Sequence, residues 1–277
     1  MAVKIMSSGR MRRLGEFCTA YQGEVNETTD RGKGNISYEE KDGPRILRGA
    51  NVTLYTLRTS SQGEDIFMLR NKFLKGKKSS TKAWHHQQNR IGFQRKSPQN
   101  NFRRLIACPV PMGEFCCESI SYFPENESAF PLNVLLALLN SNLLEWYFRL
   151  GSTNAMVSEY QINNLPTPSF AKEGKPQEIL TFTQAVARRK WDDAFGLVSP
   201  LVAEPPFPPT SMACVVRLVD EISKVEAARG DIARTERSAL APEAQPYQDL
   251  IDRILYRMAG LTDSEAQGLE KRLEGML

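Results

Sequence analysis

A run of cations with no acidic residue among them is the part of this sequence best suited to chemistry. No carboxylate occurs between Asp65 and Glu114. A surface of that charge cannot neutralise itself and attracts polyanions. Nucleic-acid phosphate is the commonest such partner, because lysine and arginine contacts to it release counterions. The cations in this interval are Arg70, Lys72, Lys75, Lys77, Lys78, Lys82, Arg90, Arg95, Lys96, Arg103 and Arg104.

Charge is also uneven along the whole chain, although the formal net charge is only +4. Up to Val110 there are 21 lysines and arginines against 9 acidic residues, a balance of +12. From Pro111 onward there are 15 against 23, a balance of −8. A charge run taken alone is more often a solvated surface, but this asymmetry favours DNA contact by the first part and protein contact by the helical end of the second.

The basic interval is rich in side chains that can recognise bases. Asn and Gln suit adenine and Arg suits guanine in the major groove, and Trp and His can stack. Lys77 and Lys78, in the flexible stretch Lys75–Thr81, would hold phosphates and carry no sequence information. With two residues from an upstream turn, the predicted DNA contacts are Arg48, Asn51, Lys72, Lys75, Lys77, Lys78, Lys82, Trp84, His85, Gln88, Arg90, Gln94, Arg95, Lys96, Arg103 and Arg104. Replacing Arg90, Arg95, Arg103 and Arg104 with alanine is expected to weaken duplex binding.

Two other chemistries have less support. A nuclease centre needs an acidic pair with a nearby lysine around a divalent metal. Only Asp192-Asp193, after Lys190, approaches that pattern, and a solvated helix end explains it better. Zinc is not expected, because the five cysteines contain no CxxC pair and His85-His86 lack a suitably spaced cysteine. Reduced thiols are expected instead.

The stretch from Leu138 to Phe170 carries a more specific signal. It begins as an apolar helix, passes through a polar turn and ends on Asn164-Leu165-Pro166-Thr167-Pro168, where two prolines exclude further helix. Its sequence, LLNSNLLEWYF…STN…YQINNLPTP, resembles the closing motif of the TaqI-like C-terminal specificity domain. That domain is the target-recognition part of type II adenine-specific DNA methyltransferases and of fused restriction–modification enzymes.

Looser matches extend this resemblance from about Leu14 to about Thr262. It implies a sequence-specific module that recognises double-stranded DNA and positions it for adenine-N6 methylation. A separate catalytic domain or subunit would flip the adenine out and methylate it. The looser matches are Arg13–Phe17, Pro44–Val52, Phe115–Pro124, Tyr247–Tyr256 and Gly260–Thr262.

The catalytic signatures of such enzymes do not occur in this sequence. There is no Asn-Pro-Pro motif, since neither Pro205-Pro206 nor Pro208-Pro209 follows an asparagine, and there is no GxGxxG. No catalytic residue and no cofactor are therefore assigned to the chain, and S-adenosylmethionine is expected on the partner methyltransferase. A stand-alone DNA-binding regulator, or a chain with its own nuclease activity, remains the alternative.

The elements that would position these residues predict an α+β fold. We expect a twisted, mostly antiparallel sheet in a recognition domain (1–170), closed by a helix over Leu132–Leu150. Asn140 and Ser141 interrupt its apolar run, and the resemblance implies that the helix packs or bends there. A helical tail (171–277) would dock on the partner. No apolar run approaches the roughly 18–20 residues of a membrane span, and a cytoplasmic protein is expected. Predicted strands are Ile46–Leu47, Val52–Leu57, Ile66–Leu69, Arg90–Gln94, Leu105–Val110 and Phe115–Phe123; predicted tail helices are Gln177–Trp191, Met212–Arg237, Gln245–Met258 and Ser264–Leu273, with a proline-rich linker over Pro200–Pro209.

Overall fold

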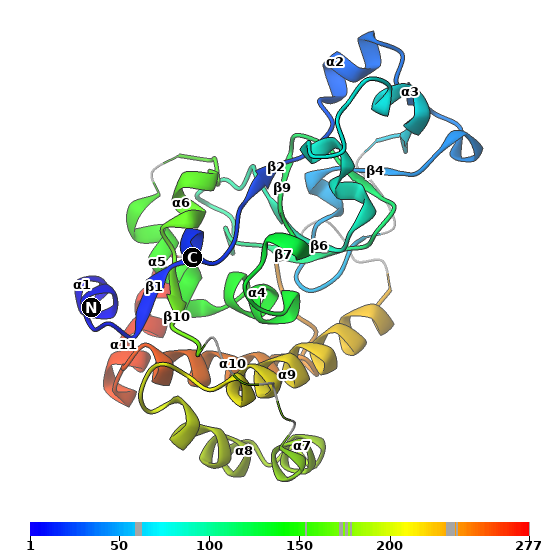
Figure 1. Cartoon of the computed structure of the whole chain (residues 1–277). Coiled ribbons are helices and arrows are strands. Elements are labelled where there is room, and N and C mark those ends of the chain that lie inside the picture. Colours follow the sequence, from blue (N-terminus) through cyan, green and yellow to red (C-terminus); the bar gives the residue numbers. More distant parts are fainter. Residues whose placement is uncertain are drawn as a thin grey trace.

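Four short strands form the central sheet, and every neighbouring pair is antiparallel. Their order is β2 (Tyr21–Gln22), β9 (Ile120–Pro124), β6 (Arg90–Gln94) and β7 (Ala107–Val110). The computed structural model describes residues 1–58, 63–152, 154–171, 174, 177, 179–230, 236 and 238–276. A small lobe lies on one side of the sheet and a layer of helices on the other (Figure 1).

The interior of the sheet explains two features of its sequence. All five residues of β6 are buried. Gly92 stands at its centre because an added Cβ would lie 2.7 Å from Cγ2 of Val110 on β7. Strand β7 is an edge strand, where Pro109 costs no ladder bond on the open side. The strand predicted at residues 90–94 is confirmed. The strand predicted at 105–110 is present at the expected sheet edge but begins at Ala107.

The other strands form three two-stranded ladders and do not extend the central sheet. The α+β class and the mostly antiparallel pairing are confirmed, but the sheets are small and open. The ladders are β1 (Met11–Arg13) with β10 (Pro166–Pro168) and β3 (Ile36–Ser37) with β5 (Phe67–Met68), both antiparallel, and β4 (Ile46–Leu47) with β8 (Phe115–Cys116), which is parallel.

Two of the predicted strands differ from the structure. Val52–Leu57 forms only a single bridge between its end residues, because Tyr55 has a positive φ of 63° and turns the chain. Phe115–Phe123 is divided into β8 and β9 by a turn in which the Ile120 amide donates to the Cys117 carbonyl at 3.0 Å.

The predicted helix over Leu132–Leu150 is two helices, α4 (Leu132–Leu139) and α5 (Asn142–Gly151), with the break at the expected position. The Asn140 side chain pairs with Ala107 on β7, donating to its carbonyl at 3.0 Å and accepting from its amide at 2.9 Å. The Ser141 hydroxyl caps α5 by accepting from the Leu144 amide at 3.2 Å. The break therefore joins the helices to the sheet, and α4 packs on β6 and β7.

The small lobe has its own apolar cluster, built around Met68, Phe73 and Phe115. It is seen at the upper right of Figure 1, where α2 and α3 project from the sheet. Its helices are α2 (Glu27–Gly32), α3 (Arg70–Leu74) and the 3-10 turns η2 (Glu40–Asp42) and η4 (Lys82–Gln87). Elsewhere lie α1 (Ala2–Ser7), α6 (Glu159–Asn163) and the turns η1 (Leu14–Glu16), η3 (Gly49–Asn51) and η5 (Glu125–Glu127).

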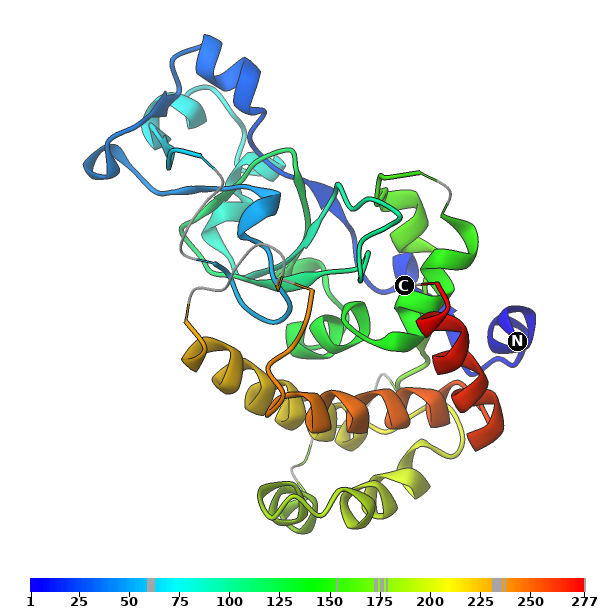
Figure 2. The same ribbon diagram turned by 180° about the vertical axis from the view of Figure 1, so that it is seen from behind.

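The helical layer packs directly against the sheet-bearing part. Helix α9 lies along α4 and α10, and one hydrophobic core runs through all three (Figure 2). Among the described residues no helix has the length and apolar character needed to cross a membrane. The layer consists of α7 (Leu180–Ala187), α8 (Trp191–Val198), η6 (Ser199–Val202), α9 (Pro209–Ala228), α10 (Gln245–Met258) and α11 (Asp263–Glu274).

The tail helices follow the sequence pattern with three differences. The first begins at Leu180, and a separate helix α8 follows it. The expected linker contains η6 and the fully buried Phe207. Helix α9 ends at Ala228, while 231–235 and 237, also predicted as helix, lie outside the described residues. The capping box of the last helix is confirmed, with the Thr262 hydroxyl accepting from the Glu265 amide at 3.3 Å.

Candidate nucleic-acid interface

Five predicted lysines lie exposed on the small lobe, and we call them the lysine surface: Lys72, Lys75, Lys77, Lys78 and Lys82. They come from α3, the turn after it and the start of η4. In the part of the chain that the structure describes, the ammonium groups of Lys75 and Lys78 make no hydrogen bond or ion pair. These two side chains are free to contact an anion.

The other lysines of this surface are held in place by uncharged groups. Lys72 Nζ donates to the Gly34 carbonyl at 2.8 Å, and Lys77 Nζ lies 3.1 Å from the centre of the Phe73 ring. Lys82 Nζ donates to the carbonyls of Gln22 and Gly23 at 3.0 and 3.1 Å. These contacts fix the three side chains in position. Because none of the partners is a carboxylate, the partners do not neutralise the positive charges.

The cations lie close enough to influence one another. Partial burial lowers the pKa of Lys77, Asp30 raises it, and the neighbouring charges of Lys33 and Lys82 lower it further. Lys33 was not among the predicted contacts. It follows the helix α2, outside the basic interval, and only the fold brings it beside Lys77. No feature of the sequence points to this proximity.

The positive surface continues from the lobe toward the sheet. Burial lowers the pKa of Lys82, Glu24 and Glu159 raise it, and Arg95 lowers it, so Arg95 lies within electrostatic range. The half-buried Arg95 is 3.5 Å from Glu159, and Lys96 beside it is exposed.

Arg90 is not a surface residue. Its side chain is completely buried and forms an ion pair with the equally buried Glu24, while Nη2 donates to the Glu114 carbonyl at 2.6 Å. The prediction failed because the compensating carboxylate comes from outside the acid-free interval, 66 residues earlier in the sequence. This guanidinium cannot reach DNA in the structure.

Arg103 and Arg104 are also buried, at 9% and 1% exposure. Arg103 donates to the carbonyls of Asn140 and Ser141 at 2.7 and 3.0 Å, and so provides hydrogen-bond donors for the backbone at the break between α4 and α5. Arg104 donates to the Ser97 carbonyl at 3.0 Å and to the Ser152 hydroxyl at 2.7 Å. Both side chains stabilise irregular backbone through these hydrogen bonds. Their substitution by alanine would therefore remove structural hydrogen bonds and would not test DNA contact.

The upstream turn and Gln94 are also structural. Arg48 is half-buried and ion-paired with Glu27 at 2.9 Å, and the hydrogen bond from Arg48 to Glu27 chiefly raises its pKa. Asn51 is fully buried and accepts from the Arg48 amide at 2.8 Å. Gln94 is 2% exposed and donates to the Val52 carbonyl at 2.8 Å. Asn51 and Gln94 are therefore removed from the set of surface contacts.

The three remaining predicted residues, Trp84, His85 and Gln88, lie half-buried beside the lysine surface. They line one open pocket with parts of η5. The structure thus brings the lysines and these three side chains together, and separates them from the buried arginines.

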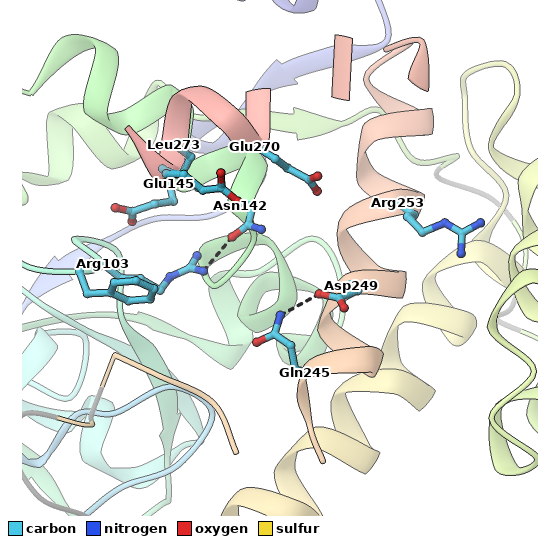
Figure 3. A pocket seen from close by; sticks show the side chains of 10 residues that line it. Arg103, Asn142, Glu145, Gln245, Asp249, Arg253, Glu270 and Leu273 are labelled. Atoms are coloured by element: carbon cyan, nitrogen blue, oxygen red, sulfur yellow. Dashed lines mark hydrogen bonds between the residues drawn. The ribbon is translucent and has the colours of Figure 1, made fainter. Parts of the chain in front are cut away.

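A different pocket, of about 520 Å³, lies between α5, α10 and α11 (Figure 3). The Arg103 side chain reaches it and donates to Asn142 at 2.9 Å, and Gln245 donates to Asp249 at 2.7 Å. No lysine of the lysine surface lines it. It is therefore not part of the candidate DNA interface.

The acidic pair considered for nuclease chemistry lies on the first turn of α8. Asp192 is almost fully exposed and 3.0 Å from Arg253, and Asp193 is exposed and 3.5 Å from Lys190. Within the described residues, no group of three or more acidic, histidine or cysteine side chains is placed to hold a metal ion. All five cysteines are buried and unpaired.

No protein-family model matches this sequence, and no curated protein matches it. Among solved structures, the chain is similar to the type IIL restriction–modification enzyme MmeI in complex with DNA, at 11% sequence identity and a TM-score of 0.47. The match covers 96% of this chain and 35% of that chain, so the protein spans about a third of its length. A likeness of this size carries no argument about function, and the TaqI-like family stays an expectation from the sequence.

Proposed function

We propose that this chain is a module that binds double-stranded DNA and recognises a sequence in it. The lysine surface is the observation that carries the proposal. Its exposed lysines have no carboxylate partners. They stand on a lobe that has its own apolar cluster and is held in place by the central sheet. Such a surface attracts the duplex backbone and releases its counterions.

The exposed residues divide into two roles. Lys75, Lys77 and Lys78, together with Lys33, would hold phosphates and set the position of the duplex. Arg95 and Lys96, near the sheet, and the pocket residues beside the lobe would approach the bases. Apart from Lys33, which only the fold brings to this surface, these residues were predicted from the sequence.

We further propose that the module positions DNA for a separate catalytic domain or subunit that carries S-adenosylmethionine and methylates adenine at N6. This part rests on the motif in Leu138–Phe170 and on the absence of Asn-Pro-Pro from the sequence. The helical part, 171–277, would dock on that partner. The exposed Leu180 on α7 and Leu197 on α8, at 67% and 40%, are apolar side chains suited to such a contact.

A salt titration tests DNA binding. Affinity for a mixed-sequence duplex is measured by fluorescence anisotropy over a range of salt concentrations. Substituting Lys75, Lys77 and Lys78 together with alanine removes up to three phosphate contacts, so the slope of log K against log salt should fall by about 2–3. The control replaces Lys190 and Lys224, two exposed lysines of the helical part, and should keep the original slope. Equal slopes in all three proteins would reject the lysine surface as the interface.

A further inference from the structure

An open pocket of about 580 Å³ lies where the lysine surface meets the sheet. One wall comes from η4 and the residue that follows it, with Trp84, His85 and Gln88, and the other from η5, with Glu125 and Glu127. The proposed function uses the first three only as general base-contacting residues. Two aromatic rings, carboxamides and two carboxylates around one space form a more specific arrangement.

The wall of this pocket is built from fixed side chains. The Tyr21 hydroxyl donates to the two carboxylate oxygens of Glu127 at 3.0 and 2.8 Å. The Tyr21 and His85 rings meet edge to face with centroids 4.8 Å apart, and His85 Nδ1 lies 3.2 Å from the Tyr122 hydroxyl. Strands β2 and β9 supply both tyrosines. The aromatic ring and the carboxylate are therefore held ready before any ligand arrives.

Other polar groups in the pocket are available to hydrogen-bond a ligand. Gln88 Oε1 accepts from the Asn126 amide at 3.1 Å, which orients the carboxamide and leaves its NH₂ group without a partner in the described residues. The Asn126 side chain also makes no hydrogen bond there. Glu125 uses one oxygen to accept from Asn89 at 3.1 Å. The pocket thus offers carboxylate acceptors and carboxamide groups at its rim.

The pocket is physically joined to the lysine surface. Ser79 and Ser80, which directly follow Lys77 and Lys78, line its edge. The Trp84 indole N–H donates to the Lys77 carbonyl at 3.4 Å and so connects the pocket to the lysine surface. A nucleotide placed here would have its phosphate beside the lysines and its base among the rings.

We infer that this pocket receives an unpaired nucleobase with a 6-amino group (adenine) or a 4-amino group (cytosine), from the strand whose phosphates the lysine surface holds. The inference rests on the proposed function. Trp84 and His85 supply faces for stacking, which tolerates any base. Glu125 and Glu127 accept from the amino group and discriminate against thymine, which carries a carbonyl oxygen at that position. The same carboxylates repel phosphate and keep it on the lysine side.

The state of His85 suits this role. Burial lowers its pKa, although Glu127 raises it and the charges of Arg90 and Lys82 lower it again. The ring is therefore neutral at neutral pH and adds no charge that would draw a phosphate into the pocket.

The test compares three duplexes of one sequence: fully paired, with one unpaired adenine, and with one unpaired thymine. The wild-type chain should bind the adenine duplex about tenfold more tightly than the thymine duplex, since one base-specific hydrogen-bonded contact discriminates on this scale. Trp84→Ala should weaken binding of both duplexes with an unpaired base, because stacking tolerates any base. The exposed pair Glu125→Ala/Asn126→Ala should abolish the adenine preference. Glu39→Ala/Glu40→Ala, on the same lobe outside the pocket, should retain it.

The outcomes separate the two proposals. Binding of all three duplexes with equal affinity would overturn the pocket assignment and leave the DNA-binding proposal standing. An adenine preference that survives Glu125→Ala/Asn126→Ala would also overturn it, as would unchanged binding of both unpaired-base duplexes by Trp84→Ala. Failure to bind any duplex at low salt would reject the DNA-binding proposal and, with it, this inference.

Discussion

Arg90 and Glu24 form an ion pair inside the protein, with neither side chain accessible to solvent. Glu24 also accepts from the Cys116 amide at 2.9 Å, and Arg90 lies over the Tyr122 ring. The pair joins β6 to the chain that follows β2 and to β8 at the base of the lobe. A cation expected to face DNA therefore helps to hold the lobe on the sheet.

Breaking this pair should be costly. Glu24→Ala leaves a buried guanidinium without its counter-charge, and we expect a loss of about 3–5 kcal/mol in the free energy of unfolding. Replacing both residues together with apolar side chains of similar volume should cost much less, because no unpaired charge remains. Urea unfolding followed by circular dichroism measures both. A single variant as stable as the wild type would contradict the burial of the pair.

Asn140 provides a second test, because its role in the Leu138–Phe170 motif is structural. Asn140→Ala leaves the buried Ala107 amide without a partner, while the Ala107 carbonyl still accepts from the Tyr55 amide at 3.0 Å. The variant should therefore lose about 1–3 kcal/mol in the free energy of unfolding, the cost of one buried unsatisfied group. Asn140→Asp keeps the acceptor but cannot donate to the carbonyl, so it should also destabilise the protein. The salt slope of DNA binding, measured where both variants are folded, should not change. A changed slope would indicate a direct role in DNA contact.

Asp252 should make stability depend on pH. It is completely buried on α10, accepting from the Asn142 amide at 2.7 Å and from Gln248 at 3.1 Å, and burial raises its pKa from 3.8 to about 7. Because the folded state keeps the proton and the unfolded state loses it above about pH 4, the stability contribution should decline as pH rises through this window and level off above about 7.

The matching measurement is unfolding at pH 5 and pH 8 for the wild type and Asp252→Asn, which cannot titrate. At about 1.4 kcal/mol per pH unit over the roughly two units below the folded pKa, the wild type should lose roughly 2–3 kcal/mol more than the variant between these pH values. A parallel decline in both proteins would show that Asp252 does not cause it.

Gly92 tests the packing of the sheet. In Gly92→Ala the new methyl group meets Val110 Cγ2 at 2.7 Å and Ile120 Cγ2 at 3.3 Å. Both neighbours are β-branched side chains on adjacent strands and have little freedom to move, so overpacking should destabilise the protein by about 1–3 kcal/mol. Gly196→Ala on α8, where nothing lies within 4 Å of the added atom, is the control and should be neutral or slightly stabilising. Equal thermal midpoints would mean that the strands separate more easily than their spacing suggests.

The sequence predicts local structure well wherever neighbouring residues determine it. The strand Arg90–Gln94 and the helix Gln245–Met258 have their predicted bounds, and the break at Asn140 and the cap at Thr262 lie where the sequence places them. Alternation, helical periodicity, a capping residue and a proline are all signals within a few positions of the element they define.

Burial of a charge is not a local property, which explains the errors in the predicted site. Glu145 accepts from the backbone of Arg104 across 41 residues of sequence, and Glu24 is 66 residues from Arg90. A window without acids therefore does not reveal whether its arginines find carboxylates or carbonyls elsewhere. The lysines remained exposed, as expected for a strongly hydrated ammonium group, whereas several arginines became braces, as expected for a planar group with five donors.

Helix α4 is covered on one side by the strands β6 and β7 and on another by α9. Truncating the chain after residue 170 would remove α9 and expose to water the apolar side chains of α4 that pack against it. We therefore expect residues 1–170 and the helical part to unfold in a single calorimetric transition, and substitutions that destabilise α9 to lower the stability of the small lobe as well.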